Sequence, residues 1–319
     1  MSLLPRFAAF VLAVSPMLPC VVMAGEAFPN KTIRIVASEA GAGSDAAARM
    51  IAQAAAGPLG QTVIVDNRGG LRAVEAVAQA LPDGYTLLFF STSLWIGPLL
   101  QKMSYDPVKD FSPVTLVSTA PVILAVHPSL PANSVKDLIA LAKSRPAGLN
   151  YGSGGTGSTP HLATELFKHK TGVNLVRVPY KGVAGALNAL FVGDVQLLFA
   201  SAGSLTPHVR SGKLRALGVG NLKPSALAPD IPTIASTVPG YELTQMTGLF
   251  VPAKTPAAII RKLNQDIVRA ISTDDTKERF FKIGAEVFGS SPEHFAATIK
   301  SEMTIIGKVI KDTGMRGDD

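Results

Sequence analysis

The sequence predicts an α/β protein built from two units, each a sheet covered by helices. Short apolar runs of buried-strand length alternate with stretches of helical spacing, the pattern typical of parallel sheets. This alternation occurs once before and once after an irregular stretch at 98–113. The chain has 319 residues and 47% hydrophobic content, enough to bury two cores of ordinary size. Because few segments connect the units, we expect two lobes with a cleft between them.

The elements are expected in the following order. The first unit has strands at 31–37, 62–66 and 84–90, helices at 45–56 and 71–80, and two short strands, 114–118 and 122–126, on either side of Pro121. The second unit has helices at 134–144, 158–171, 183–191 and 205–210, strands at 149–151, 175–178, 195–200 and 214–219, and a proline-rich loop at 221–241. A strand at 247–251 and helices at 256–271, 276–283 and 292–311 complete the chain. The last helices are amphipathic and are expected to serve as packing elements.

One stretch of the second unit carries the clearest signal for binding. Residues 152–157 (GSGGTG) leave the backbone almost bare, Ser158 or Thr159 suits a helix N-cap, and Pro160 suits the first helical turn. Such a turn presents several N–H groups beside the positive end of a helix dipole, which favours an anion. The alternative is an ordinary helix start whose donors are met by its own serines.

The other strand-to-helix turns contain no catalytic constellation. They lie at the carboxyl ends of strands, where ligands of open α/β sheets bind, and consist of Gly, Ser, Thr and Ala. The sequence contains no phosphate-binding G-x-x-x-x-G-K-[ST] motif and no G-x-S-x-G elbow, and its five histidines lack metal-ligand spacing. We expect no cofactor and no metal, and a structural role for His161 beside the glycine turn. Lys181 either meets a carboxylate or is solvated, and Trp95 either walls the cleft or belongs to a core.

An enzymatic alternative rests on the first turn. Gly41, Gly43 and Asp66 approximate the fingerprint of a dinucleotide-binding fold, so a Rossmann-type NAD(P)-dependent oxidoreductase is the second hypothesis. Three features count against it: three residues separate the glycines from the preceding strand, Glu39 would face a pyrophosphate with like charge, and the export signal described next would place the chain where nicotinamide cofactors are not expected.

The N-terminus and the charge distribution indicate export and exclude one class of partner. Residues 1–24 have the features of a signal peptide: a lone Arg6, an apolar run and a small-residue cleavage site at Ala24. The one cysteine, Cys20, lies inside this segment, so the mature chain needs no disulfide chemistry in an oxidising compartment. The net charge of +7 is scattered singly along helices, which does not support nucleic-acid binding.

Several motifs together resemble the periplasmic solute receptors of tripartite tricarboxylate transporters, also called Bug receptors. They occur in the family's order over essentially the whole mature chain: QTVIVDNR at 61–68, PDGYTLL at 82–88, YDP at 105–107, KDF at 109–111, YGSGGTGSTPHLATELF at 151–167, VPYKG at 178–182, GKLRAL at 212–217, DIPT at 230–233 and PEHF at 292–295. The chain departs from the family at Ala37-Ser38 and Gly41-Ala42 in the first loop, and at Met246, where a tryptophan is usual.

The resemblance implies a two-lobed type II periplasmic-binding-protein fold with a ligand cleft between two α/β domains. Residues 25–124 and 247–319 would form lobe 1, and 125–246 lobe 2. It further implies a non-catalytic, monomeric receptor in the periplasm that closes on a small carboxylate and delivers it to membrane permease subunits. Independently of the resemblance, Glu39 either points to solvent or favours a zwitterionic or less acidic ligand. The residues expected to contact the ligand are Ser38, Gly41 and Ser91 from the first lobe, and Ser153, Thr156, Gly157, Ser158, Lys181 and Ser201 from the second.

Overall fold

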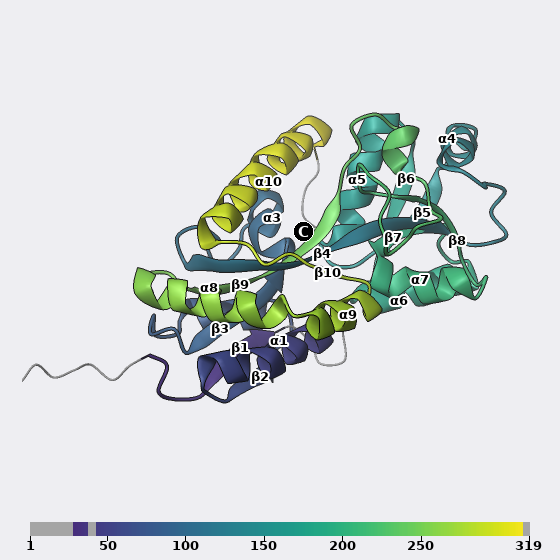
Figure 1. Cartoon of the computed structure of the whole chain (residues 1–319). Coiled ribbons are helices and arrows are strands. Elements are labelled where there is room, and N and C mark those ends of the chain that lie inside the picture. Colours follow the sequence, from purple (N-terminus) through teal and green to yellow (C-terminus); the bar gives the residue numbers. More distant parts are fainter. Residues whose placement is uncertain (1–27, 38–42, 315–319) are drawn as a thin grey trace, which may run out of the picture.

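The computed structural model of the protein describes residues 28–37 and 43–314. The strands follow one continuous path, β2-β1-β3-β9-β4-β7-β5-β6, with β10 and β8 each pairing with β4 beside it. Helices cover both faces of this path, which divides into two halves on either side of the long central strands (Figure 1). The α/β architecture and the two-lobed arrangement expected from the sequence are confirmed.

The first lobe begins with an alternation of strands and helices. Its elements are β1 (Ile33–Ala37), α1 (Gly43–Leu59), β2 (Val63–Asn67), α2 (Leu71–Ala78), β3 (Thr86–Ser91) and α3 (Ser93–Leu100). β1 pairs in parallel with both β2 and β3. Its side chains alternate between two cores: Ile33 and Ile35 pack with α1 and α8 (Ala257–Ile271), whereas Val36 packs with α2, α3 and α10 (Pro292–Thr313).

The second lobe repeats this plan. Its elements are α4 (Val135–Lys143), β5 (Leu149–Ser153), α5 (Thr159–Thr171), β6 (Leu175–Pro179), α6 (Val183–Val192), β7 (Leu197–Ser201), α7 (Ala202–Arg210) and β8 (Arg215–Val219). α4 and α5 cover one face of the sheet, and α6 and α7 cover the other. The local signals at helix ends act as expected: Ser134 Oγ accepts the Asp137 N–H, and Gly172 ends α5 with φ +68°.

The chain then returns to the first lobe. After a short 3-10 turn (Ile234–Ser236), β9 (Thr244–Pro252) inserts between β3 and β4, and α8 (Ala257–Ile271), α9 (Asp274–Lys282), β10 (Glu286–Val287) and α10 (Pro292–Thr313) follow. The boundaries expected at residues 124 and 246 therefore fall inside β4 and β9, and they stay a prediction. No helix in the described part of the chain is long and apolar enough to cross a membrane.

The prediction of two short strands around Pro121 is wrong. β4 (Phe111–Val126) is a single strand of 16 residues that belongs to both halves of the sheet. Pro121 pairs with Thr244 at the end of the β9 ladder, and the β7 ladder starts at the next residue, where Val122 pairs with Ser201. A proline lacks an N–H, but it is tolerated in a strand where one ladder stops and another begins.

The prediction of an irregular stretch from residue 98 is also wrong at its start, because Pro98 lies inside α3. Proline cannot donate to the carbonyl four residues earlier, which here belongs to Leu94. The hydroxyl of buried Tyr105 donates to that carbonyl at 3.0 Å and replaces the missing bond. A tertiary contact therefore permits a helix that local rules disfavour.

Candidate ligand site between the lobes

The glycine-rich turn between β5 and α5 is held from inside by its own neighbours. His161, which is 3% exposed, accepts the Gly157 N–H through Nδ1 at 3.2 Å, so it has the structural role that the sequence predicts. Gly157 has φ +75°, a conformation that L side chains rarely adopt, and the Ser158 N–H donates to the Gly155 carbonyl at 3.0 Å. These contacts fix the backbone conformation of the turn.

Arg177 of β6 supports the same turn from the neighbouring strand, and the sequence analysis did not identify it. Its Nε donates to Ser153 Oγ at 2.7 Å, and its Nη2 donates to the Gly154 carbonyl at 3.0 Å. Ser153 is fully buried, and its hydroxyl also donates to the Gly154 carbonyl at 3.1 Å. The Ser153 hydroxyl therefore helps to fix the conformation of the turn. The same contacts place the Arg177 guanidinium beside the turn that leads into α5.

Ser158 and Ser201 both lie at a helix N-cap without making a capping bond, but Ser201 Oγ lies 3.1 Å from Ser204 Oγ, whereas Ser158 Oγ is left without a partner in the described part of the chain. Ser158 occupies the N-cap position of α5, yet its side chain makes no capping bond. Its Oγ is buried and has no hydrogen-bond partner among the described residues. By contrast, Ser134 and Ser291 both cap their helices, α4 and α10, with their hydroxyls. A buried hydroxyl without a partner is costly, so its presence at a helix N-terminus points to an external hydrogen-bonding group.

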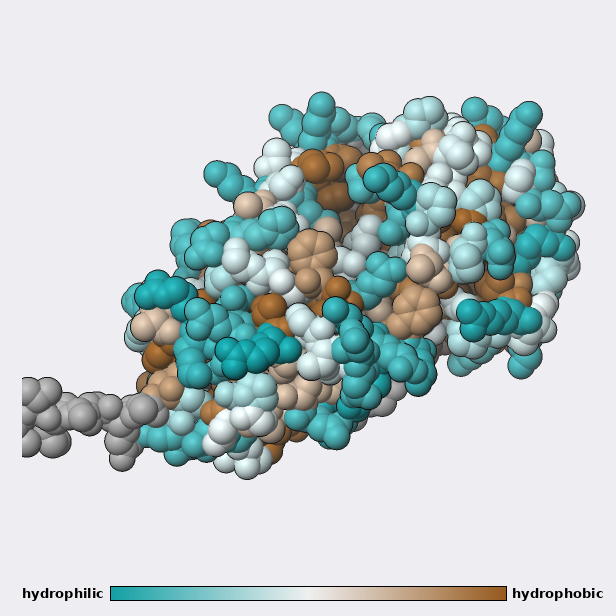
Figure 2. Space-filling view, viewed as in Figure 1, coloured by the Kyte–Doolittle hydropathy of each residue, from teal (hydrophilic) through white to brown (hydrophobic). Residues whose placement is uncertain are grey.

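The turn also touches the opposite lobe. A Cβ on Gly157 would lie 3.3 Å from Leu100 Cδ1 and 3.4 Å from Gly97 Cα, both in α3. Further along the same seam, Leu162 of α5 packs with Ile306 and Ile310 of α10. Figure 2 shows hydrophobic side chains in the hollow between α10 and α5. The two lobes are therefore in contact at the turn and along α10.

Ser91 and Ser201 lie near the place where the strands cross from one lobe to the other. Ser91 ends β3 and aligns with Thr247 of β9, whose hydroxyl lies 2.7 Å from Ser118 Oγ of β4. Ser201 ends β7 and aligns with Val122 of β4. Their hydroxyls pair locally, Ser91 with Ser93 at 3.0 Å and Ser201 with Ser204 at 3.1 Å. Ser91 of the first lobe and Ser201 of the second therefore both lie next to the strands that connect the lobes.

The remaining predicted site residues divide into two groups. Thr156 is partly buried in the glycine-rich turn, and Lys181 is exposed after β6, which lies at the end of the strand path. Ser38, Gly41 and Glu39 lie outside the described residues, as does the expected signal peptide at 1–24.

Asp66, which the oxidoreductase hypothesis needs for a ribose, has other partners. Its carboxylate accepts from Arg68 Nε at 3.0 Å and lies 3.6 Å from Arg34 Nη1. These two ion pairs explain the position of the Asp66 carboxylate without a bound dinucleotide.

Trp95 belongs to a core, one of the two positions expected for it, and its partner Glu302 was not identified from the sequence. Trp95 of α3 is fully buried, and its indole N–H donates to Glu302 of α10 at 2.8 Å. Burial raises the pKa of the Glu302 carboxyl from 4.5 to about 7; the Trp95 bond lowers it and the Glu242 charge raises it. Glu302 lies in an apolar helical stripe with Phe295, Ile299 and Ile306, which is the sequence signal that could have identified it.

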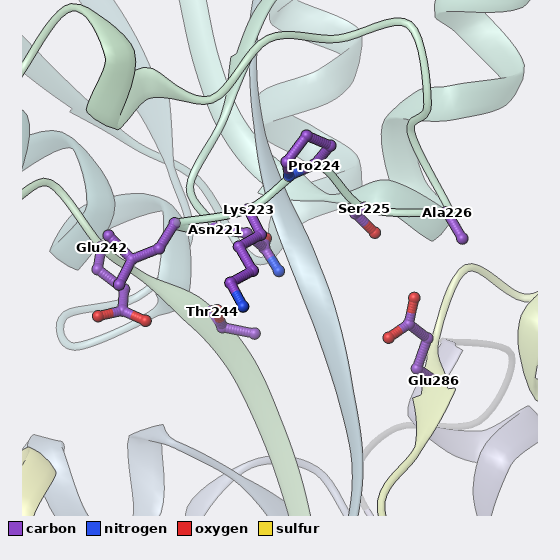
Figure 3. A pocket seen from close by; sticks show the side chains of 9 residues that line it. Asn221, Lys223, Pro224, Ser225, Ala226, Glu242, Thr244 and Glu286 are labelled. Atoms are coloured by element: carbon purple, nitrogen blue, oxygen red, sulfur yellow. The ribbon is translucent and has the colours of Figure 1, made fainter.

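A pocket of about 380 Å3 lies where β9 leaves the second lobe. Its lining includes Lys223, Glu242, Thr244 and Glu286, and Lys223 lies between the two glutamates (Figure 3). None of the predicted ligand-binding residues lines it. All three charged residues are exposed, so the pocket is distinct from the buried turn at α5.

Two α/β lobes joined by shared strands, with a glycine-rich turn against the opposite lobe, define a two-lobed solute-binding protein. The chain belongs to the tripartite tricarboxylate transporter family of receptors, whose model matches residues 47–315. Receptors of this family are periplasmic. The resemblance stated from the motifs is therefore confirmed.

Individual relatives agree with this family. The chain is 32% identical to protein BugT of Bordetella pertussis over 302 residues, covering 92% of this chain and 93% of BugT. Among solved structures it is similar to R. palustris Rpa4515 with adipate (35% identity, TM-score 0.84, 91% and 99% of the two chains covered). It is also similar to MatC of Rhodopseudomonas palustris with bound malate (30% identity, TM-score 0.78, 89% and 100% covered).

Proposed function

We propose that this protein is a monomeric, non-enzymatic periplasmic receptor that captures a small carboxylate between its lobes and delivers it to membrane permease subunits. The observation that carries the proposal is the buried, unpartnered Ser158 hydroxyl at the start of α5. It lies in a turn that Arg177 and His161 hold in shape and that touches α3 of the other lobe. Two structural relatives, one with adipate and one with bound malate, support a carboxylate as the ligand class.

The proposed contacts combine hydroxyls, backbone amides and one charge. Ser158 and Thr156 would donate hydroxyls, and Gly157 allows the backbone to approach α3 closely. Ser91 and Ser201 would act from the two lobes at the crossing strands, while Ser153 would act through the shape of the turn. Lys181, Ser38 and Gly41 complete the proposed set, and Glu39 would select for a ligand that carries a compensating positive charge.

A matched pair of serine variants tests the proposal. We expect Ser158→Ala to weaken binding of a C4–C6 dicarboxylate by about tenfold to a hundredfold, because a hydrogen bond to a charged group contributes about 1.5–3 kcal/mol. The unfolding free energy without ligand should rise, because the variant removes a buried hydroxyl that lacks a partner among the described residues. The control Ser134→Ala should do the opposite and cost about 1 kcal/mol of stability without changing affinity, because Ser134 caps its own helix.

Calorimetric titration with malate, adipate and a set of amino acids, together with urea unfolding, measures both quantities. Unchanged affinity of Ser158→Ala for every acid that the wild type binds would contradict the role of Ser158. Wild-type protein that binds no carboxylate but binds a nicotinamide dinucleotide would instead favour the oxidoreductase.

A further inference from the structure

Two glycines bring the backbones of the lobes together beside the crossing strand β4. Gly203 is the second residue of α7 in lobe 2, and Gly284 follows α9 in lobe 1 with φ +77°. A Cβ on Gly203 would collide with the Ile283 carbonyl oxygen, and a Cβ on Gly284 would collide with the backbone of Gly203. Both contacts fall below 3.0 Å, a separation that real Cβ atoms essentially never show. The approach therefore exists because neither residue has a side chain.

The contact joins elements anchored on opposite halves of the sheet. α7 follows directly from Ser201, which pairs with Val122, and Gly284 precedes Glu286, which pairs with Thr119. The three atoms nearest to a Cβ on Gly203 belong to Ile283 and Gly284, all in the other lobe. Gly203 lies in helical backbone without a positive φ, where alanine is favourable. A methyl group at this position is thus compatible with lobe 2 itself and conflicts only with the present position of lobe 1.

We propose that the contact between Gly203 and Gly284 is the stop that determines how far the lobes close, and that closure to this stop is required for tight binding. The proposal rests on the proposed function, in which the ligand is held between the lobes. A methyl group on Gly203 would displace the start of α7 from lobe 1. Ser201 lies two residues earlier, at the N-cap of α7, and is one of the proposed ligand contacts. Blocking the stop therefore withdraws Ser201 from the residues of lobe 1.

The test uses Gly203→Ala with Gly57→Ala as its matched control, because a Cβ on Gly57 in α1 meets nothing within 4 Å. Small-angle scattering measures the radius of gyration with and without malate or adipate, and calorimetry measures the affinity. We expect Gly203→Ala to keep the wild-type melting temperature without ligand and to remain more extended when ligand is added. Its affinity should fall by about tenfold or more, because apparent affinity scales with the population of the closed state. Gly57→Ala should behave as wild type.

Gly284→Asn provides an independent probe from the other lobe, because asparagine tolerates a positive φ while adding a side chain toward Gly203. Wild-type affinity and wild-type compaction in Gly203→Ala would overturn the proposal, as would a loss of folded structure in both variants. If wild type binds neither acid, the proposed ligand class fails, but the stop is still tested. Without ligand, Gly203→Ala must then have the larger radius of gyration, and equal radii would refute the stop.

Discussion

Glu302 makes the stability of the protein depend on pH in a direction opposite to that of most carboxylates. It lies between α10 and α3 and accepts a hydrogen bond from the indole N–H of Trp95. Because burial raises its pKa from 4.5 to about 7, the folded protein holds this proton more tightly than the unfolded chain. The stabilising contribution is fully present below about pH 4.5 and is lost as pH rises through about 7. The whole shift corresponds to about 3 kcal/mol.

The substitution Glu302→Gln removes this titration while keeping an oxygen that accepts the Trp95 N–H. We expect the variant to be more stable than wild type at about pH 8, and the advantage to shrink by about 2–3 kcal/mol at about pH 5. Urea unfolding at both pH values measures the difference in unfolding free energy between variant and wild type. Taking this difference cancels the titration of all other groups. An advantage of equal size at both pH values would show that Glu302 does not titrate between them and would refute the reasoning.

Two further substitutions probe the contact between α3 and α10 and the glycine-rich turn. Trp95→Phe should cost about 2–4 kcal/mol at pH 8, because it leaves a buried carboxylate without its donor, and adding Glu302→Gln should recover part of that loss in urea unfolding. An equal loss in both backgrounds would assign the cost to packing alone. Arg177→Lys should weaken carboxylate binding by about tenfold while changing unfolding by less than about 1 kcal/mol, because one ammonium cannot replace the planar fork that reaches Ser153 and Gly154. Calorimetry decides this, and unchanged affinity would argue against a role for Arg177.

The parts of the fold that local chemistry specifies could be predicted from the sequence. The alternation of strands and helices, the N-cap at Ser134 and the end of α5 at Gly172 follow from propensities and turn residues within a few positions. The same holds for the glycine-rich turn, whose shape depends on residues between 153 and 161. These elements matched the structure because no distant contact overrides them.

The errors share a different physical cause. In the local sequence Pro121 and Pro98 predict breaks, but in the structure Pro121 lies at the change of ladder partners and Pro98 lies in a helix whose Leu94 carbonyl accepts from Tyr105. Neither compensation is visible in a local window. Glu302 finds Trp95 at a separation of 207 residues, and the partners of Gly203 come from the other lobe. Site residues that act through such long-range contacts require the assembled structure.

The continuous strand β4 also constrains how this chain can vary in length. Side chains along a strand alternate between its two faces, so one inserted residue near Pro121 would exchange the faces of everything beyond it. In the present register Val122 and Leu124 face α4 and α5, whereas Ile123 and Ala125 face α6 and α7. An insertion would therefore mismatch one lobe's core against its helices while leaving the other lobe intact. Length variation should thus be tolerated in the surface loops and rejected at this joint.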